Sequence, residues 1–139
     1  MLDASTFAQL QSAHPALAGL PEKVKEMLRG ELTPSETVES SSAVKVGGSA
    51  AAVLVTSQRL IAVWLTKMLV FFKFPTIQEF SFEQMNTVQV ESGSVYLHAS
   101  PVPGDREEDY EEGTFQFVSP DEAAAFAELV QGRSPRLAA

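Results

Sequence analysis

The sequence predicts a mainly β fold of the α+β class, in which seven short strands form a partly open barrel or sandwich. A C-terminal helix is expected to cap the sheet, and two short helices are expected to precede it. Three observations support this prediction: β-branched runs separated by turn residues, a helix-capping signature near the C-terminus, and helical spacing of apolar residues near the N-terminus. The 139 residues, 45% of them hydrophobic, suffice for one core.

The predicted strands occupy most of the chain from residue 36 to residue 118. They are rich in Thr, Val and Phe, which fit a pleated and half-buried surface. Gly47-Gly48 and Ser92-Gly93 supply two of the turns between them. The expected strands are residues 36–46, 53–57, 60–66, 78–82, 87–91, 95–100 and 114–118.

Two short helices are expected within residues 1–30. Asp3 is positioned to cap the first by accepting backbone amide hydrogen bonds, and Pro15 ends it. The second begins at Pro21, whose missing N–H is not needed at the first helical position, and Gly30 ends it. This second helix has an apolar stripe, which requires a surface to cover.

The C-terminal helix carries the clearest local signals. Ser119 followed three residues later by Glu122 forms a capping box, and Gly132 is expected to end the helix. The residues beyond it lack such signals. The predicted organisation is a helical extension at residues 1–30, a β domain at 31–132 and a disordered tail at 133–139.

The charge balance is acidic, with 10 Lys and Arg residues against 18 Asp and Glu residues and a net charge of -8. Such a surface repels phosphate backbones and anionic membranes at long range, so we expect no nucleic acid partner and disfavour a membrane surface. The chain has no cysteine, which excludes disulfides and thiolate zinc sites. Neither an export signal nor a membrane-spanning segment is predicted, and a cytoplasmic location is expected.

Two short motifs resemble a known family. The segment VLVTSQRLI at residues 53–61 resembles the valine-threonine-aspartate-x-arginine-leucine-isoleucine turn of bacterial pleckstrin-homology-like and GRAM-type domains, with Ser57 in place of the aspartate. The segment FSFEQMNTV at residues 80–88 is similar to their aromatic strand and the corner that follows, with Met85 in place of isoleucine. The resemblance covers residues 32–132 and implies a pleckstrin-homology-like domain of seven strands and a terminal helix.

The resemblance implies a binding module, because this superfold hosts lipid, peptide and protein binding. In phosphoinositide-binding relatives, the loop between the first two strands carries several Lys and Arg residues that hold phosphates. Here that loop reads KVGGSAA, with Lys45 as its one cation. We therefore expect a plain glycine turn at this loop and no phosphoinositide capture.

The first motif also has a physical interpretation that does not depend on the family. Thr56 and Ser57 can hydrogen-bond their own backbone and so set the turn. Arg59 can lay its stem on the sheet and donate to exposed carbonyl groups. These residues are expected to be structural.

The apolar insert between the two motifs, TKMLVFFKFP at residues 66–75, is the candidate binding site. As a strand covered on both faces it would be ordinary core, since buried strands read as continuous apolar runs. As a projecting hairpin it would expose apolar groups flanked by Lys67 and Lys73. In that case the candidate partner-binding residues are Met68, Leu69, Val70, Phe71, Phe72 and Phe74.

Other candidate sites give weaker signals. The acidic segment around Tyr110 follows no calcium-binding template and is expected to be a solvated loop. His14 and His98 show no paired ligand spacing, and His98 is expected to face outward from a strand. No nucleophile elbow or phosphate-binding glycine loop occurs in the sequence. We therefore expect no enzymatic activity, no cofactor and no metal.

Two functions remain open at this point. The first is a non-enzymatic intracellular binding or assembly module, which contacts a protein partner or forms a homo-oligomer through the insert. The alternative is a peripheral membrane or lipid-binding domain that uses residues 67–74, with Lys67 and Lys73 at the lipid headgroups. The acidic net charge favours protein contact.

Overall fold

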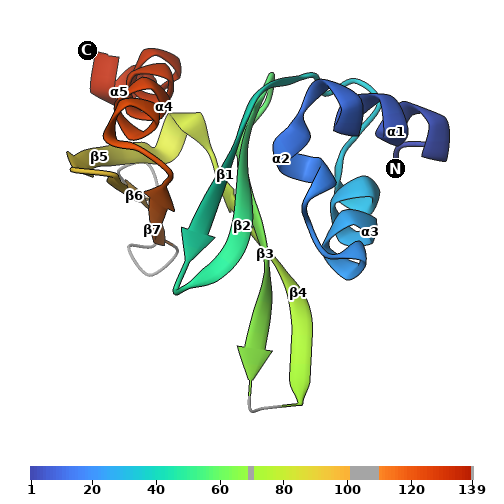
Figure 1. Ribbon diagram of the computed structural model, residues 1–139. Helices are drawn as coiled ribbons and strands as arrows, with labels where there is room; N and C mark the ends of the chain where they lie inside the picture. Colours follow the sequence, from blue (N-terminus) through green and yellow to red (C-terminus); the bar gives the residue numbers. More distant parts are fainter. Residues whose placement is uncertain (69–70, 101–109, 139) are drawn as a thin grey trace. The chain divides into compact units, whose positions relative to one another are not determined.

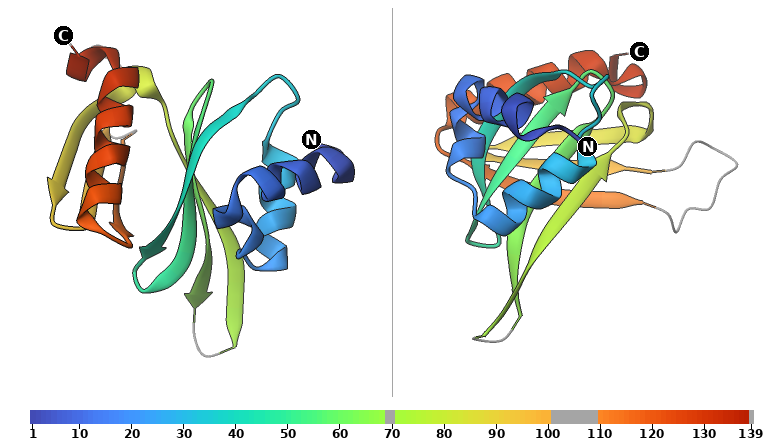
Figure 2. Two further views of the ribbon diagram at one scale, coloured as in Figure 1. Left: turned by 45° about the horizontal axis from the view of Figure 1, so that its top comes forward. Right: turned by 90° about the vertical axis from the view of Figure 1, so that its right-hand side faces the viewer.

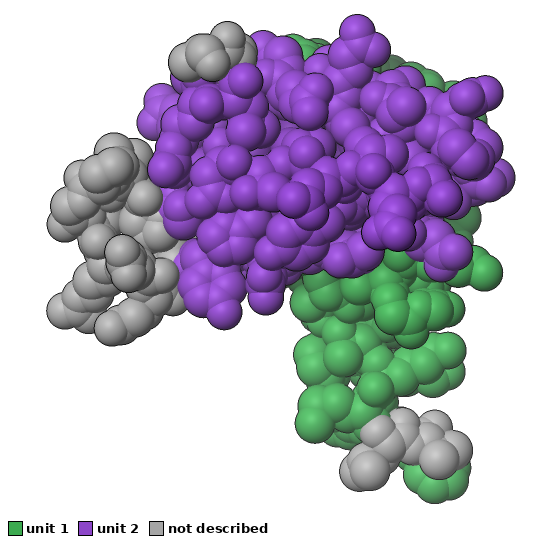
Figure 3. Space-filling model, turned by 90° about the vertical axis from the view of Figure 1, so that its left-hand side faces the viewer, with its two compact units in different colours: residues 1–78 green, residues 79–139 purple. Residues whose placement is uncertain are grey.

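The described residues, 1–68, 71–100 and 110–138, contain seven strands, five α-helices and one 3-10 turn in the computed structural model (Figure 1). The chain divides into two compact units, residues 1–78 and residues 79–139 (Figure 3). Each unit combines antiparallel strands with helices. The predicted α+β class is therefore confirmed, together with the N-terminal helices and the C-terminal helix.

The first unit is built on a meander of four strands in the order β4-β3-β2-β1. Gly47 and Gly48 form the β1–β2 turn with φ angles of 56° and 83°, as the sequence predicts, and Gly adopts such positive angles at no steric cost. Strands β3 and β4 are longer than expected, because both continue into the apolar insert. The bounds are β1 Val38–Val46, β2 Ser49–Thr56, β3 Leu60–Met68 and β4 Phe72–Phe80.

Three helices precede these strands: α1 (Ala4–Ala13), α2 (Pro15–Ala18) and α3 (Glu22–Glu31). The predicted cap is confirmed, since the Asp3 side chain accepts a hydrogen bond of 2.7 Å from the Thr6 amide. The short α2 was not predicted.

Gly30 does not end α3, which continues to Glu31 with Leu32 as its C-cap. This prediction was wrong because Gly30 keeps helical backbone angles here, and a glycine ends a helix only where the chain turns left-handed.

The core of the first unit lies between these helices and one face of the strands (Figure 2). Helical residues such as Leu17, Val24 and Leu28 pack against Leu54 and Ile61 of the sheet, and all five are buried. Burial of each such side chain contributes about 1.5–3 kcal/mol. The N-terminal helices thus share one core with β1–β4, and the first compact unit extends to Gln78.

The second unit contains three antiparallel strands in the order β7-β6-β5 and a helix that contacts all of them. In α4, Ser119 caps the helix by accepting a hydrogen bond of 3.2 Å from the Glu122 amide, as the sequence predicts. Phe126 of α4 is buried with its ring 4.9 Å from that of Phe117. The bounds are β5 Met85–Glu91, β6 Ser94–Ala99, β7 Glu111–Phe117 and α4 Pro120–Arg133.

Two predictions at the ends of this unit were wrong. The strand expected at residues 78–82 ends at Phe80, residues 82–84 form a 3-10 turn, and β5 begins at Met85 instead of residue 87. The expected disordered tail forms the short helix α5 (Pro135–Ala138) after α4 passes through Gly132. Ser134 is fully buried, and Arg136 donates to the carbonyl of Ser100 at 3.1 Å. These contacts order the tail although its sequence lacks a helical pattern.

We predict that Phe126→Ala destabilises the protein by about 3–5 kcal/mol, because it opens a cavity between α4 and the strands of the second unit. Denaturant unfolding measures this loss. The matched control is Glu128→Ala on the exposed face of the same helix, which should change stability by less than about 0.5 kcal/mol. Equal effects of the two variants would contradict the packing of α4 on the sheet.

Candidate functional site

A buried ion pair fixes the turn between β2 and β3. Glu36 is 8% exposed, and its Oε2 accepts hydrogen bonds from Arg59 Nε at 2.9 Å and from Thr56 Oγ1 at 2.6 Å. Arg59 Nη2 also donates to the carbonyl of Glu31 at 2.8 Å. The pair therefore ties the segment after α3 to the sheet.

The local part of this arrangement was predicted from the sequence and is confirmed. Thr56 Oγ1 accepts hydrogen bonds from the amides of Gln58 at 3.1 Å and Arg59 at 3.0 Å, which sets the turn. Arg59 donates to a backbone carbonyl as expected. Its partner Glu36 was missed, because an ion pair between residues 23 positions apart leaves no periodic signal in a sequence.

The electrostatics of Glu36 indicate a structural role. Burial alone would raise the pKa of this carboxyl, but hydrogen bonds from Arg59, Thr56 and the Thr33 amide outweigh burial and hold the pKa below its ordinary value. The carboxylate thus stays charged with its oxygens occupied by protein donors. Such a group stabilises the fold and is not available for proton transfer.

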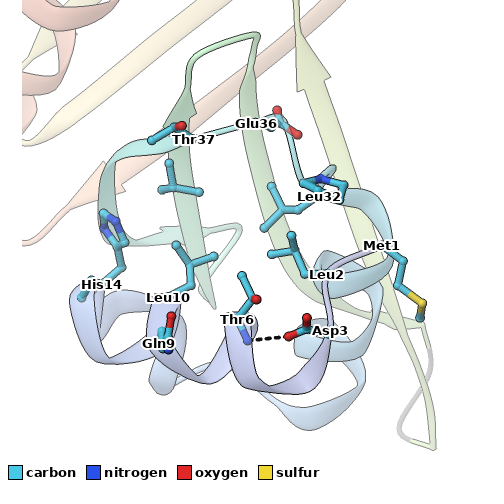
Figure 4. A pocket seen from close by; sticks show the side chains of 13 residues that line it. Met1, Leu2, Asp3, Thr6, Gln9, Leu10, His14, Leu32, Glu36 and Thr37 are labelled. Carbon is cyan, nitrogen blue, oxygen red and sulfur yellow. Dashed lines mark hydrogen bonds between the residues drawn. The ribbon is translucent and has the colours of Figure 1, made fainter.

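A pocket of about 630 Å³ lies between α1 and the segment of residues 32–38 (Figure 4). Its volume falls within the range of small-molecule sites. Its three titratable side chains, however, are engaged in holding the fold: Asp3 caps α1, His14 Nδ1 lies 2.9 Å from Ser41 Oγ, and Glu36 binds Arg59. The lining therefore offers no convergent set of groups for catalysis.

The second unit has a polar cluster around His98. The Nδ1 atom of His98 lies 2.8 Å from Asn86 Oδ1, and the ring stacks on Tyr110 with centroids 5.3 Å apart. Asn86 Nδ2 donates to Ser100 Oγ at 2.5 Å. His98 is thus half-buried and held in a network rather than simply facing outward, and His14 belongs to the other unit.

The acidic segment gives no metal site among the residues that the structure describes. Asp105, Glu107, Glu108 and Asp109 lie outside the described residues, and Glu111 and Glu112 belong to β7. In the described part of the chain, no three or more His, Asp or Glu residues come together as a metal-binding group.

None of the described helices is both long and apolar enough to cross a bilayer.

The apolar insert forms the end of a projecting β3–β4 hairpin, which extends past the adjacent strands in Figure 1. The exposed fractions are 95% for Phe71, 62% for Phe72 and 55% for Met68. Leu69 and Val70 lie outside the described residues. At Met68, Phe71 and Phe72 the structure therefore contradicts the interpretation of the insert as a buried core strand.

The register of the sheet explains why the hairpin projects. Ala51 of β2 pairs with Trp64 of β3, and β2 begins only two residues earlier at Ser49. Residues of β3 beyond Thr66 therefore have β4 as their partner and no β2 residue opposite. A two-stranded ribbon with no third strand and no helix packed on it leaves its side chains exposed to solvent.

The projecting hairpin has two different faces. Side chains alternate along a strand, and Thr66 of β3 hydrogen-bonds Thr76 of β4, so these two threonines share a face. On the opposite face, Leu65 and Ile77 pack against the core that lies between the N-terminal helices and the strands. The alternation assigns Lys67 to the face of Leu65, and Lys73 to the face of Ile77.

The face of Thr66 and Thr76 carries the apolar side chains. Alternation places Trp64 and Met68 on the face of Thr66, and Phe72 and Phe74 on the face of Thr76. The rings of Phe72 and Phe74 lie 6.2 Å apart, which confirms that they share one face. We call this set of four residues the apolar face: Trp64, Met68, Phe72 and Phe74.

Sequence reasoning found the residues of the hairpin end but not this arrangement. Residues 68–72 are all apolar, so no period-2 pattern distinguishes the two faces. Trp64 was missed because it precedes the insert in sequence. The alternation of Lys67 and Met68, and of Lys73 and Phe74, was the one available signal.

Comparison with protein-family models and with curated proteins finds no match for the chain. The choice among sites therefore depends on geometry. The exposed end of the β3–β4 hairpin is the candidate functional site. The Glu36–Arg59 ion pair and the polar cluster around His98 are instead occupied by hydrogen bonds within the protein.

We predict that Glu36→Gln destabilises the protein at neutral pH by about 3–5 kcal/mol, since it leaves Arg59 without its buried partner. Because the pKa of Glu36 is lowered from 4.5, the stability gained from its charge is present above about pH 4.5 and is lost as the pH falls through the lower native value. The difference between wild type and variant should shrink as the pH falls below that range.

Denaturant midpoints between neutral and strongly acidic pH measure this difference. The exposed Glu26→Gln variant is the control and should follow the wild-type curve. A Glu36→Gln variant that runs parallel to the wild type at every pH would contradict the role given to the ion pair.

Proposed function

We propose that this chain is a non-enzymatic binding module that attaches to a membrane surface through the end of its β3–β4 hairpin. The observation that carries the proposal is the exposure of Phe71, Phe72 and Met68 on an element that projects from the sheet. Lys67 and Lys73 flank these residues on the two strands and are also exposed. Apolar groups with adjacent cations are typical of elements that lie in a lipid headgroup layer.

The acidic charge of the chain does not oppose this proposal at the hairpin itself. Residues 1–78 hold six acidic and seven basic side chains, whereas residues 79–139 hold twelve acidic and three basic ones. Within residues 60–78, Lys67 and Lys73 are the only Asp, Glu, Lys or Arg side chains. The net charge of -8 therefore comes from the second unit, and the hairpin is cationic.

The size of the hairpin end also favours a membrane over a protein interface. A fully buried aromatic side chain covers about 150–250 Å², so the described residues Phe71, Phe72 and Met68 together offer at most about 450–750 Å². Stable protein interfaces bury about 800 Å² on each partner. A lipid layer requires no such minimum, because each apolar group that enters it gains free energy separately.

Pro75 argues against self-association by strand pairing at the edge of the first unit. β4 is the edge strand of the four, and Pro75 lies in its interior without an N–H to donate. A second strand added to this edge would lose a ladder hydrogen bond there. Proline at an edge strand is a common protection against such pairing.

The pleckstrin-homology-like resemblance supports a binding module in general terms. The described residues form seven strands that are followed by a helix, which is the order that the resemblance implies. We infer that these strands form the partly open barrel or sandwich of that superfold. Capture of a phosphoinositide headgroup at the β1–β2 turn is not part of the proposal, because Lys45 is its one cation.

Self-association through the hairpin end is the second candidate function. It rests on the same exposed phenylalanines, since an apolar patch of this kind can pack on its copy in a second chain. Light scattering separates the two candidates, because a membrane-binding hairpin leaves the purified chain monomeric, whereas self-association raises its mass in a concentration-dependent manner.

We predict that the wild-type chain co-sediments with phosphatidylserine-containing vesicles, and that the double variant Phe71→Ser with Phe72→Ser binds them at least about tenfold more weakly. The reason is that two exposed aromatic side chains no longer enter the lipid. Val118→Ser removes an apolar side chain that is 80% exposed in the second unit and serves as the control.

The control should bind like the wild type. If the wild type stays in the supernatant, or if the double variant keeps its wild-type fold and binds equally well, the proposal is wrong. Circular dichroism of both variants verifies the fold, which these exposed positions should not affect.

We further predict that Lys67→Gln and Lys73→Gln each weaken binding to anionic vesicles by about 1 kcal/mol, because each removes one cation near the headgroups. Lys45→Gln, which changes an exposed lysine at the β1–β2 turn, should have no such effect. Vesicle titrations measure the three variants under one salt condition. Equal losses for Lys45 and the two hairpin lysines would indicate a nonspecific charge effect instead.

A further inference from the structure

The apolar surface of the hairpin extends beyond its tip. Phe71 lies at the turn, but the apolar face runs back along both strands from Met68 and Phe72 to Phe74 and Trp64. Met68 and Phe72 are more than half exposed, and Phe74 and Trp64 are half-buried. Exposure therefore decreases gradually along one face instead of ending at the turn.

The opposite face has a different composition. Leu65 and Ile77 pack into the helical core, and Lys67 and Lys73 follow them toward the tip. The projecting part is thus amphipathic across its thickness: Met68, Phe72 and Phe74 lie on one face, and Lys67, Lys73 and Pro75 lie on the other. An amphipathic element of this kind lies in the plane of a lipid interface, with its apolar face down and its cations extending to the headgroups.

We propose that the hairpin lies obliquely on an anionic lipid surface on its apolar face, so that Phe74 and Trp64 enter the headgroup region together with Met68 and Phe72. This inference rests on the proposed membrane attachment and adds the orientation of the hairpin. Aromatic side chains suit this depth, and Trp in particular is enriched at membrane interfaces. In an end-on arrangement, the tip would enter the lipid first and Trp64 would stay in water.

Trp64 is the single tryptophan of the chain, so its fluorescence reports on the apolar face without any substitution. The experiment uses the wild-type chain and vesicles of phosphatidylcholine and phosphatidylserine, with and without bromine atoms on the acyl chains near the headgroups. We expect a blue shift of the emission on binding, quenching by the brominated lipids, and protection from a water-soluble quencher.

The outcomes separate this inference from the proposed function. If the chain sediments with vesicles while the emission of Trp64 and its access to the water-soluble quencher stay unchanged, attachment stands and the oblique orientation is wrong. If the chain does not sediment, both are wrong. Quenching together with sedimentation supports both.

Two substitutions provide an independent test of orientation. Oblique binding predicts that Phe74→Ser weakens vesicle binding by about tenfold, comparable with Phe72→Ser, since both side chains lie on the apolar face. Val118→Ser again serves as the control. Retention of full binding by a folded Phe74→Ser variant would contradict the inference, and if this variant does not fold, the Trp64 measurement on the wild type decides.

Discussion

The pairing of β2 with β3 is the interaction on which the first unit and its candidate site both depend. Its register places Ala51 opposite Trp64, and thereby decides where the sheet ends and where the hairpin continues as a two-stranded ribbon. Leu54 pairs with Ile61 in this ladder, and both lie in the core between the helices and the strands. A shift of one residue would move every side chain of β3 to the other face, so the buried core and the exposed apolar face are specified together.

Groups outside the sheet hold the turn that joins β2 and β3. Arg59 binds Glu36 and the carbonyl of Glu31, so the end of α3 and the turn cannot separate without exposing a buried charge pair. The helices in turn cover one face of the strands. The packed part of the unit thus supports a hairpin end whose described residues Met68, Phe71 and Phe72 are exposed.

Much of the fold could be predicted from the sequence, because its signals are local. Asp3, Ser119 and the Gly47-Gly48 turn act on neighbouring residues, and all three were identified correctly. The length of the hairpin and the identity of its exposed face depend on the β2–β3 register, which is not local. The same is true of Glu36, whose partner lies 23 residues away. The residues of the hairpin end were predicted, but Trp64 and the arrangement of the apolar face required the structure.

Hydrogen exchange with and without phosphatidylserine-containing vesicles tests the central claim most directly, namely that the hairpin is the membrane-binding element. We predict slower exchange on binding for peptides that cover residues 64–76, and unchanged exchange for peptides from the acidic second unit, residues 79–139. Protection of the second unit, or protection of the β1–β2 turn without protection of the hairpin, would contradict this claim.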